Sequence, residues 1–216
     1  MHPGVFSPAP MPARIAAAAL VALAALATPT QAQDMANGSD LARRAVHVCA
    51  ACHGDGGRSR NAAYPALAEQ MPMYLSRQLK DFRGQQRSEA GTQAYMWGVS
   101  ALLDDDTIQA LADYYGAQAP LPGHGKGSPA VLRAGREIFD KGLPAKGVRA
   151  CASCHGEHAE GAAGFPRLAG QHADYLYAQL KGFGTRLRPH GVLMKAETAH
   201  MSPVQMKAVA AYLQSL

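Results

Sequence analysis

The four cysteines of this 216-residue chain occur in two motifs of identical spacing. The motifs are Cys49-Ala50-Ala51-Cys52-His53 and Cys151-Ala152-Ser153-Cys154-His155. C-x-x-C-H is the attachment signature of c-type heme, in which two thiols bond to the two vinyl groups of one porphyrin. The histidine that follows is thereby brought to one face of the iron. The spacing predicts two covalently bound hemes c, one on each cysteine pair, with His53 and His155 as iron ligands.

Other uses of paired cysteines fit the chain less well. A structural zinc site needs its second pair about 15 to 20 residues after the first, whereas Cys52 and Cys151 lie in opposite halves of the chain. A thioredoxin-like dithiol needs a strand–helix–strand context, and the flanking sequence here predicts helices. A disulfide within one motif would be strained, although pairing between the two motifs is geometrically open. The matching flanks of the motifs favour heme.

The two motifs belong to an internal repeat. From Pro65 to Phe82 and from Pro166 to Phe183 the two copies align without a gap. Further on, both copies carry apolar residues at i, i+3, i+4 and i+7, which predicts a terminal helix with one buried face. These are Ile108, Leu111, Ala112 and Tyr115 in the first copy, and Met206, Val209, Ala210 and Leu213 in the second.

The register of the repeat also selects a second iron ligand for each heme. Heme iron held by one histidine needs a second axial donor to form a closed electron-transfer site, and methionine sulfur is the usual one. Met96 superposes on Met194, and no other pair of methionines aligns in this way. Met201 is the main rival, but its counterpart is Leu103, and both precede a predicted helix start. We therefore predict Met96 and Met194 as ligands and Met201 as a core residue.

Two prolines are predicted to orient the ligating histidines. Such a histidine usually donates its other ring N–H to a carbonyl or carboxylate, and proline presents its carbonyl rigidly because its φ is fixed. Pro65 and Pro166 occupy matching positions after the two motifs. The other histidines have no counterparts in the register and are expected on the surface or in local hydrogen bonds, with bis-histidine ligation left open. They are His47, His124, His158, His172, His190 and His200.

The N-terminal segment has the layout of a secretory signal peptide, predicted over residues 1–32. A proline-rich start with Arg14 is followed by the apolar run 15–27 and by small residues at Thr30-Gln31-Ala32. A membrane anchor is the alternative, but the run falls short of the roughly 20 residues that span a bilayer. We expect cleavage near Gln33 and a periplasmic protein.

The mature chain is predicted to be all-α, with residues 33–118 as the first domain, 119–127 as a linker rich in proline and glycine, and 128–216 as the second domain. No segment shows sustained two-residue alternation, so no strand is expected. Ser39 or Asp40 is predicted to cap a helix that leads to Cys49, and Ser128 to cap its counterpart. Middle helices are expected over 74–82 and 175–183.

Charge is distributed unevenly, since the first half of the mature chain is slightly acidic and the second half is basic. Such a field can orient a partner protein during encounter. No basic run and no aromatic interleaving indicates nucleic-acid binding. Peripheral association with a membrane surface stays open.

Each half resembles a class I cytochrome c domain, and the pair resembles the tandem diheme cytochrome c4 family. The resemblance rests on both C-x-x-C-H motifs, on the string from Lys146 to Cys151, on the string from Gly164 to Gln171 and on the segments from each predicted methionine ligand to the following tyrosine. It implies two all-α class I domains related by a pseudo-two-fold axis, each wrapping one heme. It also implies electron donation in the periplasm, commonly toward a terminal oxidase.

These features predict an electron carrier with no catalytic residues, whose partners are other redox proteins. One alternative is a dedicated cytochrome subunit that accepts electrons from a periplasmic dehydrogenase. A more remote alternative is a diheme peroxidase, which would need an iron with an open position. The methionine supplied in both halves argues against that enzyme.

Overall fold

The computed structural model of the chain describes residues 1, 4, 29–89, 92–125 and 127–216. The predicted signal peptide therefore lies almost wholly outside the described residues. Within the part of the chain that is described, no helix is both long enough and apolar enough to span a bilayer.

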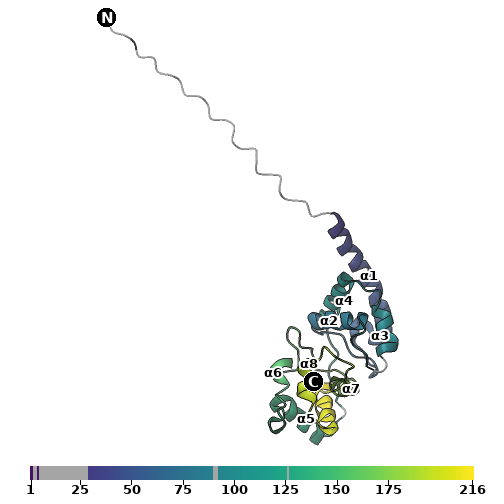
Figure 1. Cartoon of the computed structure of the whole chain (residues 1–216), viewed down its shortest axis with the longest axis vertical. Helices are drawn as coiled ribbons and strands as arrows, with labels where there is room; N and C mark the ends of the chain where they lie inside the picture. The colour runs from purple at the N-terminus through teal and green to yellow at the C-terminus, as the bar shows by residue number, and fades with distance from the viewer. Residues whose placement is uncertain (2–3, 5–28, 90–91, 126) are drawn as a thin grey trace.

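The described chain is helical and forms two groups of helices (Figure 1). The first group comprises α1 (Pro29–His53), η1 (Asp55–Gly57), α2 (Pro72–Arg83), α3 (Thr92–Ser100) and α4 (Asp105–Gly116). The second comprises α5 (Pro129–Lys141), η2 (Pro144–Lys146), α6 (Ala152–His155), α7 (Ala173–Phe183), α8 (Val192–Thr198) and α9 (Pro203–Gln214). Among the described residues, β-pairing is limited to isolated bridges at Leu143–Val148 and Ala162–Phe165. The predicted all-α fold class is confirmed.

Local sequence sets the starts of α4, α5 and α9, each of which has a side-chain cap. Ser202 opens α9 with a capping box, in which its hydroxyl accepts the Gln205 N–H and the Gln205 side chain accepts the Ser202 N–H. The Asp104 carboxylate caps α4 by accepting the Thr107 N–H at 2.7 Å. Ser128 caps α5, as predicted.

The predicted start of the first helix at Ser39 or Asp40 is wrong. The helix α1 begins at Pro29, so that both residues lie in its interior, as does the predicted cleavage position near Gln33. The Asp40 carboxylate pairs with Arg43 and Arg44, one turn further on, instead of capping the helix. Pairs at i, i+3 and i, i+4 stabilise a helix interior, which explains why a residue type typical of caps is tolerated here.

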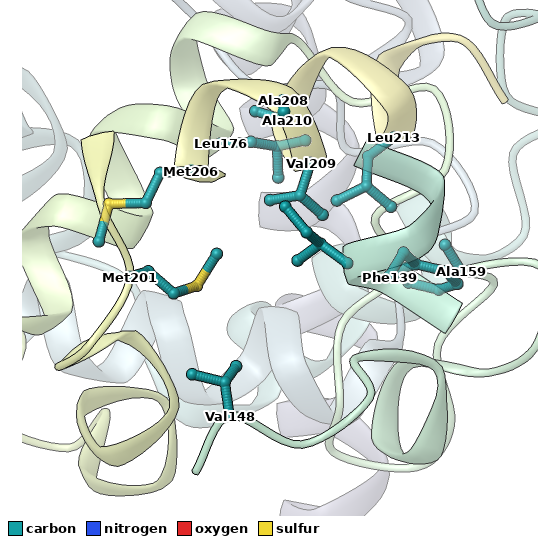
Figure 2. Close-up of a cluster of buried hydrophobic side chains, with 11 residues drawn as sticks. Phe139, Val148, Ala159, Leu176, Met201, Met206, Ala208, Val209, Ala210 and Leu213 are labelled. Carbon is teal, nitrogen blue, oxygen red and sulfur yellow. The ribbon is translucent and has the colours of Figure 1, made fainter. Parts of the chain in front are cut away.

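Each half has its own hydrophobic core, built where its first helix packs on its last. In the second half α5 crosses α9 around Phe139 and Val209, which are almost fully buried (Figure 2). Gly135 permits this crossing, because a Cβ at that position would lie only 2.1 Å from the Ala208 carbonyl oxygen. In the first half α1 packs on α4 around the buried Ile108 and Leu111. The terminal helices predicted from the repeat thus form the cores.

Candidate heme-binding sites

The first C-x-x-C-H motif ends α1. Cys49 and Cys52 are half-buried free thiols, and His53 is buried with 8% of its surface exposed. Gly54 ends the helix directly after the histidine, with φ of 76° and with Arg58 O only 2.6 Å from the position of an added Cβ. Only glycine adopts this conformation at little cost. The chain can therefore turn away from the histidine at once.

The second motif forms a separate short helix, α6, in place of a helix end. Cys151 and Cys154 are again half-buried free thiols, and His155 is buried with 5% of its surface exposed. Gly156, with φ of 84°, repeats the turn seen after the first motif. A segment from Gly142 to Arg149, closed by the Leu143–Val148 bridge, separates α5 from this helix. The two motifs therefore reach the same local arrangement from different chain paths.

Each histidine bonds through Nδ1 to the carbonyl of the proline that follows its motif. His53 Nδ1 donates to Pro65 O at 2.8 Å, and His155 Nδ1 donates to Pro166 O at 2.9 Å. Because a carbonyl can only accept, Nδ1 carries the proton and Nε2 keeps its lone pair for a metal. Burial lowers the pKa of both histidines, with the carbonyl contact acting in the opposite sense, so the neutral imidazole is favoured.

The thiols are placed poorly for chemistry that needs a thiolate. Burial raises the pKa of Cys49, and it raises the pKa of Cys151 to about 11. A redox dithiol or zinc ligand requires a thiolate, which such surroundings disfavour. Among the described residues no group of three or more His, Cys, Asp or Glu side chains could hold a metal ion. A pair of free thiols beside a buried histidine with an available Nε2 instead fits a covalently attached heme.

The two predicted methionine ligands occupy equivalent helices. Met96 lies in α3 and Met194 in α8, and both are half-buried. The hydroxyl of Ser100 donates to Met96 O at 2.5 Å, and that of Thr198 donates to Met194 O at 2.8 Å. This shared bond fixes the backbone of each methionine in the same way. The rival Met201 lies in the core of the second half beside Met206 (Figure 2).

A buried polar network joins the two halves, and we did not predict it from the sequence. Arg87 Nη2 donates to Gln179 Oε1 at 2.9 Å, and Arg188 Nη2 donates to Gln78 Oε1 at 2.7 Å. Each arginine also donates to a tyrosine hydroxyl of the opposite half. The Glu89 carboxylate lies 2.9 Å from Arg87 Nε and 3.6 Å from Arg188 Nε. Both arginines occupy matching positions of the repeat, and this match is the sequence feature from which the network could have been found.

One expectation for the remaining histidines is wrong. His172 is buried, with 2% of its surface exposed, and its ring lies 5.8 Å from that of His124. It opens α7 where the two halves meet, so the contact between domains removes it from solvent. His190 is exposed, as expected, but its ring bonds to Asp81 of the other half at 2.7 Å and not to a residue near it in the sequence.

Comparison with known proteins agrees with this arrangement. Residues 35–115 and 132–216 each match the family model described as cytochrome c. Cytochrome c4 of Thiocapsa roseopersicina is 38% identical over 181 residues, which are 80% of this chain and 89% of that protein. The chain belongs to the diheme cytochrome c4 family. The crystal structure of reduced recombinant cytochrome c4 from Pseudomonas stutzeri superposes with a TM-score of 0.73 at 32% identity, covering 82% of this chain and 98% of that one.

Membership of this family settles the cofactor and the general function. The chain carries two covalently bound hemes c. It is an electron carrier and not an enzyme, so the peroxidase alternative is excluded. A further relative, the thiosulfate dehydrogenase electron acceptor of Thiomonas intermedia, is 37% identical over 175 residues, which are 76% of each chain.

Proposed function

We propose that His53 with Met96, and His155 with Met194, are the axial iron ligands of two closed hemes. Cys49 with Cys52, and Cys151 with Cys154, would hold the porphyrins through thioether bonds. The observation that carries this proposal is the buried histidine of each motif, whose Nδ1 donates to a proline carbonyl while Nε2 stays available. Iron bound by histidine nitrogen and methionine sulfur cycles between two oxidation states with no open position.

The surrounding residues would keep both sites rigid during electron exchange. Pro65 and Pro166 fix the ring plane and raise the basicity of the ligating histidines. The hydroxyls of Ser100 and Thr198 donate to the backbone carbonyls of Met96 and Met194 and would restrain the backbone of each methionine. Little rearrangement is then needed when the charge on the iron changes. Such rigidity suits a carrier that passes on single electrons.

The ligand assignment can be tested with three methionine variants. The weak red absorption band of ferric heme bound by methionine sulfur should lose half its intensity in Met96→Ala and in Met194→Ala. Met201→Ala should keep the whole band, although it loses core packing. Mass analysis should show two hemes in all three proteins. A full band in either of the first two variants would reject that methionine as a ligand.

We further propose residues 1–32 as a cleaved signal peptide, 33–118 and 128–216 as the two domains, and 119–127 as the linker. Two observations support the division. Each half has its own core, and the described residues between Gly116 and Pro129, which exclude position 126, contain no helix. The predicted cleavage implies a periplasmic location. Sequencing the N-terminus of exported protein tests it, and a start far from Gln33 would contradict it.

For the physiological role we propose donation toward a terminal oxidase. The family resemblance supports this role, and the Thiomonas relative supports a second candidate, acceptance from a dehydrogenase. Stopped-flow mixing of reduced protein with oxidase-containing membranes should give fast oxidation of both hemes. Slow oxidation there, combined with fast reduction by a purified thiosulfate dehydrogenase, would favour the second candidate.

A further inference from the structure

Two glutamines at matching positions of the repeat reach across to the opposite half. Gln171 Oε1 accepts the Ala66 N–H at 2.9 Å, and its Nε2 donates to Ala66 O at 2.9 Å. Gln70 Oε1 accepts the Arg167 N–H at 2.7 Å, and its Nε2 donates to Arg167 O at 3.0 Å. Both glutamines are buried, with 6% of their surface exposed. Each therefore pairs with one residue of the other half through two hydrogen bonds.

The orientation of each glutamine amide is fixed by a further bond within its own half. Gln70 Oε1 also accepts the Met71 N–H at 3.0 Å, and Gln171 Oε1 also accepts the His172 N–H at 3.1 Å. Because each oxygen receives two N–H groups, the amide nitrogen must point to the opposite carbonyl. The same bonding pattern on both sides makes the contact reciprocal.

The N–H groups that bond to the two glutamines belong to the same peptide units as the proline carbonyls that accept from the histidines. The Ala66 N–H shares its peptide plane with the Pro65 carbonyl, which accepts from His53. The Arg167 N–H likewise shares its plane with the Pro166 carbonyl, which accepts from His155. A hydrogen bond to the N–H of a peptide polarises its carbonyl and makes it a stronger acceptor. Each glutamine thus acts on the histidine of the other domain.

We propose that Gln171 is a positioning residue for His53 and that Gln70 is one for His155, so that each domain tunes the heme of its neighbour. This inference rests on the proposed ligation by the two histidines. A stronger carbonyl acceptor draws more on the Nδ1–H and makes the imidazole a better electron donor to iron. That donation favours the ferric state. Loss of a glutamine should therefore raise the reduction potential of the heme in the opposite domain.

The test uses Gln171→Met and Gln70→Met in the full two-heme protein, because methionine preserves length and volume but cannot make these bonds. In Gln171→Met the equilibrium constant for reduction of the first heme should rise about threefold, which is about 28 mV at 59 mV per tenfold for one electron. The second heme should change much less. Gln70→Met should give the mirror result. NMR signals of each heme, followed through stepwise oxidation, assign the two potentials.

A matched control is Gln118→Met, since the Gln118 side chain also donates to a backbone carbonyl, that of Tyr114, but within its own half. It should leave both potentials unchanged. A second readout is amide hydrogen exchange, which should speed up at Ala66 in Gln171→Met and at Arg167 in Gln70→Met. If a methionine variant does not retain two hemes, Gln171→Asn and Gln70→Asn replace it in the test. Asparagine keeps an amide but is one methylene too short to make these bonds, so each should still raise the reduction potential of the heme in the opposite domain.

The inference is overturned if the variants shift the heme of their own domain, shift both hemes equally or shift neither. Its failure differs from failure of the ligand proposal. Wild-type protein must show two hemes with histidine–methionine spectra for the ligation to stand. If it does and the crossed shift is absent, only the role of the glutamines is lost.

Discussion

The crossing of α5 and α9 predicts opposite effects for one substitution at two glycines. Gly135 and Gly182 are both buried within helices of the second half. A Cβ at Gly135 would lie 2.1 Å from the Ala208 oxygen and 2.7 Å from the Tyr212 Cβ, well short of the 3.4 Å at which ordinary contact begins. A Cβ at Gly182 would make its nearest contact at 3.6 Å. Only Gly135→Ala must therefore push two helices apart.

The expected magnitudes follow from this geometry. Gly→Ala within a helix gains up to about 1 kcal/mol from backbone propensity, which Gly182→Ala should largely realise. Overpacking costs about 1–3 kcal/mol and occasionally more, and at Gly135 the obstacle is backbone that cannot rotate away. The close contact between α5 and α9 at Gly135 also lies beside the core around Phe139 and Val209. We expect a net loss of about 3 kcal/mol for Gly135→Ala, at the upper end of this range.

Thermal unfolding of the two-heme protein, followed by circular dichroism, measures both effects. For a domain of this size 1 kcal/mol moves the Tm by about 4–8 °C, so Gly135→Ala should unfold its half at least 10 °C below wild type on this scale. Gly182→Ala should unfold slightly above wild type. Equal or higher Tm values for both variants would refute the close α5–α9 packing.

Two further predictions concern charged groups. Replacing Glu89 by Gln leaves two buried guanidinium groups without their carboxylate and should lower the free energy of unfolding by about 3 kcal/mol. The control Arg136→Gln breaks an exposed pair with Asp140 and should lower it by less than about 0.5 kcal/mol. Equal urea midpoints for the two variants would contradict this expectation. Asp104→Ala should cost about 1 kcal/mol at neutral pH, because the cap of α4 is lost. Hydrogen bonding from Thr107 lowers the pKa of Asp104, so its contribution is present above the unfolded pKa and is lost as pH falls through the folded value. Urea unfolding from pH 7 to pH 2 should show the two proteins converging, and a constant gap would argue against the cap.

Much of the functional site could be predicted because its parts are local in sequence or fixed by the repeat. The spacing of each C-x-x-C-H motif places two thiols and a histidine on one turn of chain. The register of the duplication pairs Met96 with Met194 and Pro65 with Pro166. The Pro65 and Pro166 contacts follow as predicted. Helix caps at Ser202 and Asp104 are equally local, since each side chain bonds to a backbone group three residues away.

The first helix shows where local reasoning ends. Asp40 is a residue type that favours caps, yet it lies inside α1 because its carboxylate pairs with arginines on the next turn. Both outcomes suit the same residue type, so composition could not choose between them. A second example is Glu69, which stands where the second half has Gly170. Both have positive φ, and the Glu69 carboxylate pairs with Arg167 of the other half at 2.9 Å.

The sequence by itself determined the number of hemes, their points of attachment and the helical class, because covalent motifs and helix periodicity act over a few residues. Only the tertiary structure decided how the halves meet. Gln70 and Gln171 were visible as matched residues, but nothing in either copy says that their partners lie about 100 positions away in the other one. A side-chain amide bonds equally well to water, to its own domain or to a neighbour, and the contact between domains makes that choice.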